Sequence, residues 1–444
     1  MRRDDAVVRN GSNMRAPTPR RQPRQSPAST AAPVAVADEE PTDRYLRKRE
    51  EVLAAAALTF NELGIGGGTL SGIAQRVGLA TNSVTYYFRR KQDLVAACFL
   101  RAIEAHLEDV RHAARQPTVA ARVEACLVRQ ASLLADIATG ARPPLVVFSE
   151  LRTLEGRVGA DLHRAYTELF REMRGLLVGP ETAALSRADL NARAHMLLSA
   201  FHMLRVWLPR VEPDQYERVA ARAADIMLRG MGDGGSRWPA GDSLGSDWTL
   251  VDGVDTPGDR FLRAATDLLN EKGYRGASVD RISARLNVTK GSFYHHIEHK
   301  DDLILACFER TLTAVRRATA QAQALSRPGW EQACAMARSL ACLQTSGMGP
   351  LLRVGALGAL PAFDGRAQAY RRMFQLTERI RDLIVTGMMD GSIRPLDSGI
   401  AAHLLGGSIN SIAELHHWLP PSEHHRLVDL CLKPVFEGLL APPA

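Results

Sequence analysis

The sequence predicts an all-α fold, and two observations carry this prediction. Apolar residues recur at helical spacing through most of the chain, as in Val52, Ala55, Ala56, Leu58 and Thr59. No stretch shows a convincing series of strands with the alternation of two that a half-buried sheet requires. The composition, with 45% hydrophobic and 24% charged residues, is that of a soluble globular protein. Because 444 residues exceed one ordinary core, we expect two or more domains.

Net charge, cysteine spacing and the length of apolar runs indicate which partners and which cellular compartment to expect. A net charge of +7 permits an anionic partner, although a merely basic surface explains it equally well. The six cysteines form no Cys-x-x-Cys pair, which favours buried thiols in a reducing compartment. No apolar run approaches the roughly 18 residues of a membrane span. We therefore expect a cytoplasmic protein with no membrane partner and no cofactor.

Two stretches of biased composition divide the chain. Residues 1–41 are rich in Arg, Pro, Ser, Thr and Ala and lack a helical period, so we predict a disordered basic tail. Residues 232–257 are dominated by Gly, Asp, Ser and Pro, which predicts a linker. These two segments leave two halves of helical sequence.

The two halves are an internal repeat. Residues 64–99, shifted by 209 positions, align without a gap on residues 273–308, and 11 of the 36 positions are identical. The tripeptide Trp-Leu-Pro recurs at Trp207 and Trp418. Each half is therefore expected to be a complete unit of ordinary domain size.

The second copy predicts its helices in order. Gly273 ends a first helix, because a residue without Cβ adopts the left-handed closing conformation readily. Ser278 can cap the next helix, whose inward face is Val279, Ile282, Ser283 and Leu286. Asn287 aligns with Gly78, and finding Asn and Gly at one position predicts a turn with positive φ.

A short helix follows that turn in each copy. In the second copy Thr289 can cap it, Phe293 and Ile297 point inward, and Lys300 opens the next helix. In the first copy Val84 and Phe88 point inward, and Thr81 is expected to act as the cap because Ala80 cannot. Two short helices joined by a tight turn form a helix-turn-helix, whose second helix enters the major groove of DNA.

The predicted DNA-binding residues lie at the helix starts, on the exposed side of the second helix, or at the following lysine. In the first copy they are Thr69, Thr81, Asn82, Ser83, Thr85, Tyr86, Tyr87 and Lys91. In the second copy they are Ser278, Thr289, Lys290, Gly291, Ser292, Tyr294, His295, His296 and Lys300. The alternative for the first copy is that it has drifted and binds DNA weakly or not at all.

Both copies resemble the TetR (tetracycline-repressor-like) family of transcriptional regulators. The second copy matches the family motif nearly throughout residues 289–296 and 300–303, whereas the first departs at Ala80, Thr81, Asn82 and Thr85. The resemblance implies a helix-turn-helix domain followed by a helical regulatory domain in each half. The expected boundaries are 42–104, 105–231, 258–313 and 314–444.

The resemblance also implies a function. Family members dimerise over two half-sites, so two units in one chain suggest intramolecular pairing as a covalent pseudo-dimer, with a homodimer of chains as a further possibility. Because the groove-facing residues differ between copies, we expect an asymmetric double-stranded DNA operator. The expected activity is repression, relieved by a small hydrophobic or acyl-type effector that Trp207 and Trp418 help to bind.

Two alternatives stand beside this regulator. A module that keeps the scaffold but binds a ligand or a protein, without specific DNA contact, is the main alternative. Enzymatic activity has little support, because no paired-carboxylate motif or nucleophile elbow stands out. A metal site is not expected, since no Glu or Cys completes one around His295, His296 and His299.

Overall fold

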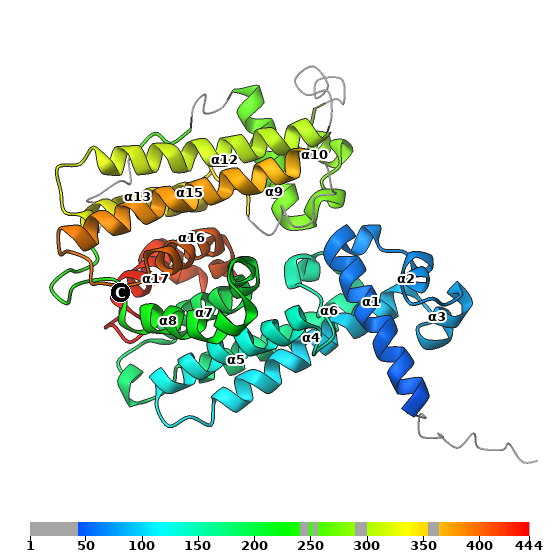
Figure 1. The fold of residues 1–444 in the computed structure, drawn as a ribbon. Coiled ribbons are helices and arrows are strands. Elements are labelled where there is room, and N and C mark those ends of the chain that lie inside the picture. The colour runs from blue at the N-terminus through cyan, green and yellow to red at the C-terminus, as the bar shows by residue number, and fades with distance from the viewer. Residues whose placement is uncertain (1–42, 240–247, 252–255, 289–299, 354–363, 444) are drawn as a thin grey trace, which may run out of the picture. The chain divides into compact units, whose positions relative to one another are not determined.

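The computed structural model describes residues 43–239, 248–251, 256–288, 300–353 and 364–443 (Figure 1). Within these ranges the regular structure is helical, apart from an isolated bridge between Gly232 and Ile393. The predicted all-α class is confirmed. The tail predicted over residues 1–41 lies outside the described residues.

The described helices follow one another in the same order in each half (Figure 1). The first half contains α1 (Asp43–Gly67), α2 (Leu70–Arg76), α3 (Thr81–Tyr87), α4 (Lys91–Ala113), α5 (Val119–Thr139), the 3₁₀ segment η1 (Phe148–Thr153), α6 (Gly156–Gly175), α7 (Arg187–Trp207) and α8 (Tyr216–Arg229). The second contains α9 (Pro257–Gly276), α10 (Val279–Leu286), α12 (Lys300–Gln323), α13 (Gly329–Thr345), α15 (Asp364–Met389), α16 (Ser398–Leu415) and α17 (Leu427–Glu437). Helices α4 and α12 continue without a break across the boundaries expected at 104 and 313.

The ends of the first helices show how glycine acts in each copy. Helix α1 is kinked at Gly64, whose φ of 70° and ψ of 165° are not helical. The aligned Gly273 was predicted to end α9, but that helix is assigned three residues further, to Gly276. The prediction is therefore short by three residues for the end of α9, and the kink at Gly64 was not predicted.

An apolar core holds α1 to α4 together. Its fully buried members include Val52, Leu53, Ile73 and Phe99. Leu58, which the sequence places in the same helical period as Val52, has 41% of its surface exposed. The helical period places Leu58 at the edge of the apolar stripe that α1 buries against α2 to α4.

The repeat extends from the sequence to individual contacts. Each pair of equivalent residues differs by 209 positions, and the two sets of contacts have the same partners. They are Cys98 Sγ to the Leu53 carbonyl (3.7 Å) with Cys307 Sγ to the Leu262 carbonyl (3.5 Å), and the ion pairs Arg76–Glu62 and Arg285–Glu271. The two copies therefore share a local architecture as well as a motif.

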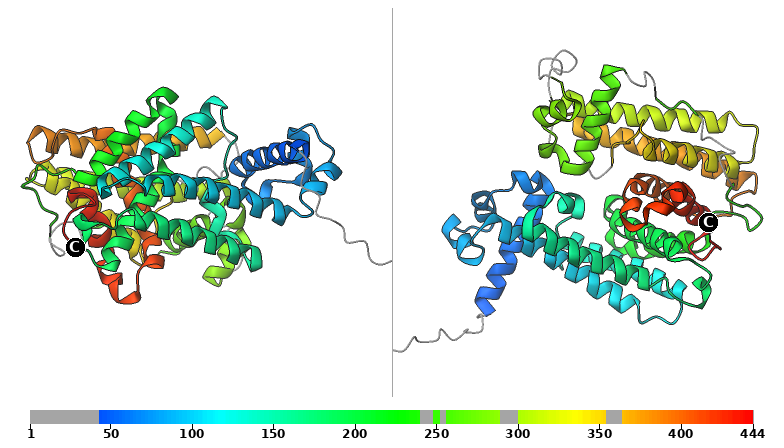
Figure 2. Two further views of the ribbon diagram at one scale, coloured as in Figure 1. Left: turned by 90° about the horizontal axis from the view of Figure 1, so that it is seen from below. Right: turned by 180° about the vertical axis from the view of Figure 1, so that it is seen from behind.

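Helices α7 and α8 contact α16 and α17, and their green and red ribbons lie side by side in Figures 1 and 2. Asn191 Nδ2 donates to the Trp418 carbonyl over 2.7 Å, and His195 Nε2 donates to the Ser411 carbonyl over 2.9 Å. Apolar residues of all four helices belong to one continuous buried cluster. Hydrogen bonds and apolar packing thus both cross from one half to the other.

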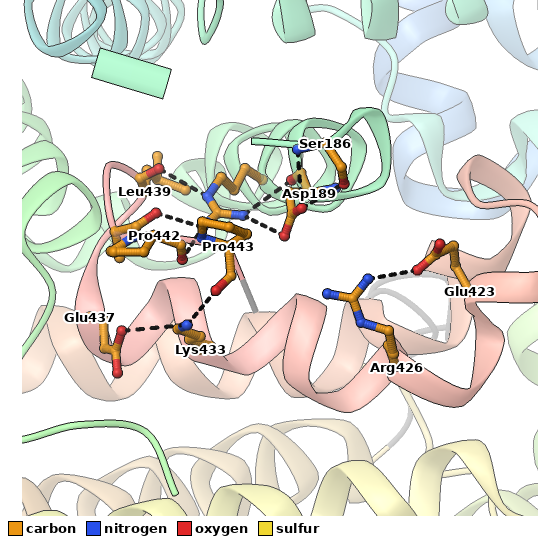
Figure 3. A network of polar contacts seen from close by, with 11 residues as sticks. Ser186, Asp189, Glu423, Arg426, Lys433, Glu437, Leu439, Pro442 and Pro443 are labelled. Carbon is orange, nitrogen blue, oxygen red and sulfur yellow. Dashed lines mark hydrogen bonds and ion pairs between the residues drawn. The ribbon is translucent and has the colours of Figure 1, made fainter. Parts of the chain in front are cut away.

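Arg193 on α7 is the largest fully buried polar side chain among these contacts, with 0% of its surface exposed. Its guanidinium donates to the carbonyls of Leu439 (2.9 Å), Ala441 (2.9 Å) and Pro442 (3.2 Å), and it pairs with Asp189 at 3.4 Å. Ser186 in turn donates its hydroxyl to Asp189 over 2.5 Å (Figure 3). Because a buried guanidinium needs acceptors for its N–H groups, this network ties the segment after α17 to α7.

The described part of the predicted linker packs against the second half. Trp238 is 7% exposed, and its Nε1 donates to Asp429 of α17 over 2.8 Å. Trp330 Nε1 donates to the Arg237 carbonyl over 3.0 Å. Residues 237 and 238 are therefore held against the second half by the hydrogen bonds of two indoles. Residues 240–247 and 252–255 of the linker lie outside the described residues.

None of the helices within the described ranges combines the length and the apolar character that a membrane span requires.

Candidate functional site

The first copy has the complete helix-turn-helix geometry, and the described residues of the second copy include its first helix and the turn that follows. Thr69 Oγ1 accepts from the Gly72 amide over 3.1 Å at the start of α2, and Ser278 Oγ accepts from the Arg281 amide over 3.3 Å at the start of α10. After these helices the chain turns at Gly78 with φ of 64° and at Asn287 with φ of 54°. Asn287 is the one non-glycine residue with positive φ in the described part of the chain. The predicted cap at Ser278 and the predicted left-handed turn are confirmed.

This turn gives a direct stability prediction. A Cβ added at Gly78 would meet nothing within 4 Å, so Gly78→Ala costs only backbone strain, which we expect to lower the free energy of unfolding by about 1–2 kcal/mol. Gly175 of α6 also has open space around it and lies in a helix, so Gly175→Ala is the matched control. We expect the control to raise stability by about 0.5–1 kcal/mol. Thermal denaturation followed by circular dichroism measures both, and the same sign for the two changes would contradict the turn geometry.

Helix α3 presents a buried side and an exposed side, as predicted. Val84 is fully buried and Phe88 is 5% exposed, so they anchor the helix to the core of α1 to α4. On the other side Asn82 is exposed and Tyr86 is 73% exposed. Tyr87 differs from expectation, because it is only half exposed and packs partly against that core.

The predicted cap of α3 is wrong. Thr81 is the first residue of the helix, and Ala80 occupies the capping position without any side-chain hydrogen bond. Ala80 has the extended backbone conformation of a capping residue, so α3 begins at Thr81, one residue earlier than a threonine cap would give. Thr81 is instead exposed at the helix start.

The remaining predicted residues of the first copy surround α3. Thr69, the cap of α2, is exposed. Ser83 and Thr85 are half-buried, and Thr85 Oγ1 donates to the Asn82 carbonyl over 2.8 Å. Lys91 is half-buried at the start of α4, where Asp93 accepts from the Arg90 amide over 3.1 Å. Thr69, Thr81, Asn82 and Tyr86 therefore have the exposure that contact with DNA requires.

The second recognition segment cannot be compared in this way. Lys300 begins α12 as predicted, and Ser278 caps α10. The other residues predicted to bind DNA in this copy lie outside the described residues: Thr289, Lys290, Gly291, Ser292, Tyr294, His295 and His296.

Family comparison agrees with the repeated geometry. Residues 52–98 and residues 261–307 each match the model of the bacterial regulatory proteins of the tetR family. The chain carries two tandem TetR-family domains. The first TetR domain covers most of α1 to α4, and the second covers the equivalent part of α9 to α12.

Known relatives match over short stretches of the chain. The chain is 43% identical over 55 residues to the transposon Tn10 TetC protein of Escherichia coli, which is 12% of this chain and 28% of that protein. It is 38% identical over 45 residues to IcaR of Staphylococcus epidermidis, the negative transcriptional regulator of a biofilm operon, which is 10% of this chain and 24% of that protein. The chain thus spans less than a third of these two relatives. A solved structure of the TetR family regulator PfmR from Thermus thermophilus aligns over 43% of this chain and 97% of PfmR, with 18% identity and a TM-score of 0.34.

Each TetR domain is joined to its own half by the same asparagine clamp. Asn61 Nδ2 donates to the Leu145 carbonyl and its Oδ1 accepts from the Val147 amide, both over 2.9 Å. In the second copy, Asn270 makes the same two bonds to the Leu351 carbonyl at 2.9 Å and the Arg353 amide at 3.0 Å. The prediction missed both asparagines, although they are identical residues 209 apart and an alignment begun three residues earlier would have included them.

The segments held by these clamps line a pocket of about 750 Å³. Its other walls come from α6, α7 and α9 and from the ends of α13 and α16. Trp418 lies in the wall and stacks on Phe170 with ring centroids 3.6 Å apart. Trp207, the other predicted ligand residue, is buried elsewhere and stacks on His403 with centroids 5.7 Å apart. Only one of the two tryptophans is therefore placed to meet a ligand there.

An ion-pair triad crosses the pocket. Glu414 of α16 pairs with Arg152 of η1 at 3.2 Å and also with Arg353. Burial raises the pKa of the Glu414 carboxyl, but Arg353 and Arg152 outweigh burial and hold this pKa below its usual value. Glu414 is thus an ionised carboxylate between two guanidinium groups.

His195 and His202 in the pocket are neutral hydrogen-bonding groups. Burial lowers the pKa of His195 and, more strongly, that of His202. Since His195 Nε2 faces the Ser411 carbonyl, that nitrogen carries the proton. His202 Nε2 is buried and has no hydrogen-bond partner among the described residues. No group of three or more potential metal ligands is found in the described part of the chain.

Proposed function

We propose that this protein is a DNA-binding transcription regulator whose two TetR domains read the two halves of one asymmetric operator. The observation that carries the proposal is the exposed polar side of α3, set on a buried core by Val84 and Phe88. A helix so anchored can place Asn82 and Tyr86 at base edges and phosphates of the major groove. The match of both domains to bacterial regulatory proteins supports the same function.

The proposed assembly is a covalent pseudo-dimer. The hydrogen bonds from Asn191 and His195 to the second half, and the apolar cluster shared by α7, α8, α16 and α17, support intramolecular pairing. Linkage in one chain raises the effective concentration of one half for the other into the mM range. Pairing of two chains is a further arrangement, and the stoichiometry of the DNA complex distinguishes it.

The proposed regulation is repression that a small effector relieves. The name of IcaR, a negative regulator, supports the direction. The clamps at Asn61 and Asn270 support the coupling, because each joins a TetR domain to a segment that lines the pocket. An effector that changes these segments can alter operator affinity by about 5–150-fold, the usual range of allosteric coupling. We place this activity in the cytoplasm, with the DNA.

Footprinting with purified protein on the DNA upstream of its own gene tests the proposal. We expect one protected region containing two unlike half-sites, and a binding constant that falls steeply as salt rises. Protein that shows no sequence preference in this experiment would instead favour the scaffold as a module for ligand or protein interaction.

Lys91 gives a finer expectation for the same experiment. Because a lysine at the start of α4 is placed to contact phosphate, Lys91→Ala should weaken binding to all sequences and reduce the salt slope by about one. Gln92→Ala, an exposed neutral neighbour, should leave the slope unchanged. A loss confined to one DNA sequence would contradict a phosphate contact.

A further inference from the structure

We infer that the pocket between the halves binds one small organic carboxylate per chain, whose acidic group competes with Glu414 for Arg152 and Arg353. This inference rests on the proposed function, since it names the effector class of that regulator. Five features of the pocket support it: its composition, its charge, its unpaired donors, its aromatic wall and its attachment to both TetR domains.

The pocket is built by both halves. From the first come η1, α6 and α7, and from the second come α9, α13, α16 and the segment at Arg353. Its volume of about 750 Å³ lies within the range of sites for drug-sized ligands. A ligand that fills it touches both halves at once, so we expect one site per chain.

Charge in the centre of the pocket favours an anion. Arg152 and Arg353 share the single carboxylate of Glu414, so this triad carries one positive charge in excess. Arg353 Nε is buried and has no hydrogen-bond partner among the described residues. A carboxylate fits the planar fork of a guanidinium with two parallel hydrogen bonds, so a ligand of this class gains a donor that Glu414 does not use.

The other acidic side chains of the pocket wall lie in hydrogen bonds or ion pairs of their own, or are buried. Glu150 accepts from the Ile65 amide over 2.5 Å, and Glu271 is held by Arg285 at 3.0 Å. Asp267 also faces the pocket, and burial raises the pKa of its carboxyl, which disfavours its charged form. The two arginines therefore remain the groups best placed to receive an added anion.

The opposite part of the wall is aromatic. Phe148 and Tyr166 have ring centroids 5.4 Å apart, and His202 lies 5.2 Å from Phe148 by the same measure. An apolar ligand body can pack on these rings, while His202 Nε2 offers a hydrogen-bonding nitrogen. Apolar rings beside a few polar groups are the usual composition of small-molecule sites.

The two arginines are also connected to the DNA-binding domains. The Arg353 amide is itself bonded to Asn270 of the second TetR domain. Arg152 belongs to η1, in which Glu150 accepts from the Ile65 amide next to the Gly64 kink of α1. A ligand that draws the arginines from Glu414 therefore acts on segments bonded to both TetR domains.

Calorimetry on the full chain tests the inference, with octanoate and phenylacetate as probes and 1-octanol and 2-phenylethanol as neutral counterparts. We expect one carboxylate per chain and at least about tenfold weaker binding of each alcohol. Arg353→Met should weaken carboxylate binding about tenfold, and Arg327→Met, on an exposed arginine paired with Glu331, should not change it. Equal affinity for acids and alcohols, two ligands per chain, or no binding of either acid up to about 1 mM would overturn the inference.

Glu414→Gln separates the inference from a general loss of structure. Removing the competing carboxylate should tighten octanoate binding at least about threefold, an effect that misfolding does not produce. Weaker binding by this variant, with an unchanged circular dichroism spectrum, would contradict competition. Gel-shift assays with and without the two acids are run beside calorimetry. Specific operator binding that the acids do not change overturns only this inference. Failure to bind any DNA specifically overturns the proposed function.

Discussion

Replacing Arg193 with alanine is expected to lower the free energy of unfolding by about 3–5 kcal/mol. The change leaves the Asp189 carboxylate, whose side chain is 2% exposed, without its counter-ion. It also leaves the carbonyls of Leu439, Ala441 and Pro442 without their donor. Urea denaturation followed by circular dichroism and by tryptophan fluorescence measures the loss, as a shift of the transition midpoint.

Arg164→Ala is the control for this prediction. Arg164 pairs with Asp161 three residues away, but 78% of its side chain is exposed. Exposed ion pairs contribute about 0–1 kcal/mol, so we expect little change in the midpoint. Arg193→Lys keeps the charge but has one nitrogen for several acceptors, and its stability should lie between those of Arg193→Ala and the parent. An Arg193→Ala protein as stable as the Arg164→Ala protein would show that the buried network is not needed.

Asn82→Ala and Tyr86→Ala are each expected to reduce operator affinity by about 1–3 kcal/mol, or roughly 5–150-fold, without a change in thermal stability. Both side chains are exposed on α3, so their truncation removes little packing from the protein itself. Fluorescence anisotropy on the footprinted operator measures the affinity. The loss should be confined to the half-site that the first TetR domain occupies.

Met389→Ala serves as the control for these variants, because Met389 is 84% exposed and lies at the end of α15. It should leave affinity and protection unchanged. Equal loss of protection over both half-sites after Asn82→Ala would contradict the division of the operator between the two domains. Unaltered affinity in both α3 variants would mean that the first copy has drifted and does not read DNA.

Local chemistry made much of the helix-turn-helix predictable. Asn287 in one copy aligns with Gly78 in the other, and these two residue types adopt a left-handed backbone at low cost. Both positions have positive φ. Val84 and Phe88 lie on one helical face at a spacing of four, and both are buried. Thr81 was misplaced because α3 begins directly after Ala80, which occupies the capping position without a side-chain hydrogen bond.

The pocket could not be predicted in the same way. Its walls come from residues that are far apart in the chain, such as Arg152 and Glu414, and no local pattern links them. Trp207 and Trp418 share a motif, yet only Trp418 reaches the pocket, because the two halves contribute different surfaces to it. The asparagine clamps were within reach, since Asn61 and Asn270 obey the repeat.

The bonds of Arg193 have a consequence for biosynthesis. Its acceptor at Leu439 follows 246 residues later, and a ribosome adds about 5–20 residues per second. Roughly 10–50 s therefore pass in which α7 has been made but its guanidinium lacks those acceptors. The nascent first half lacks these hydrogen bonds through this interval. The two halves therefore do not complete their folding independently, one after the other.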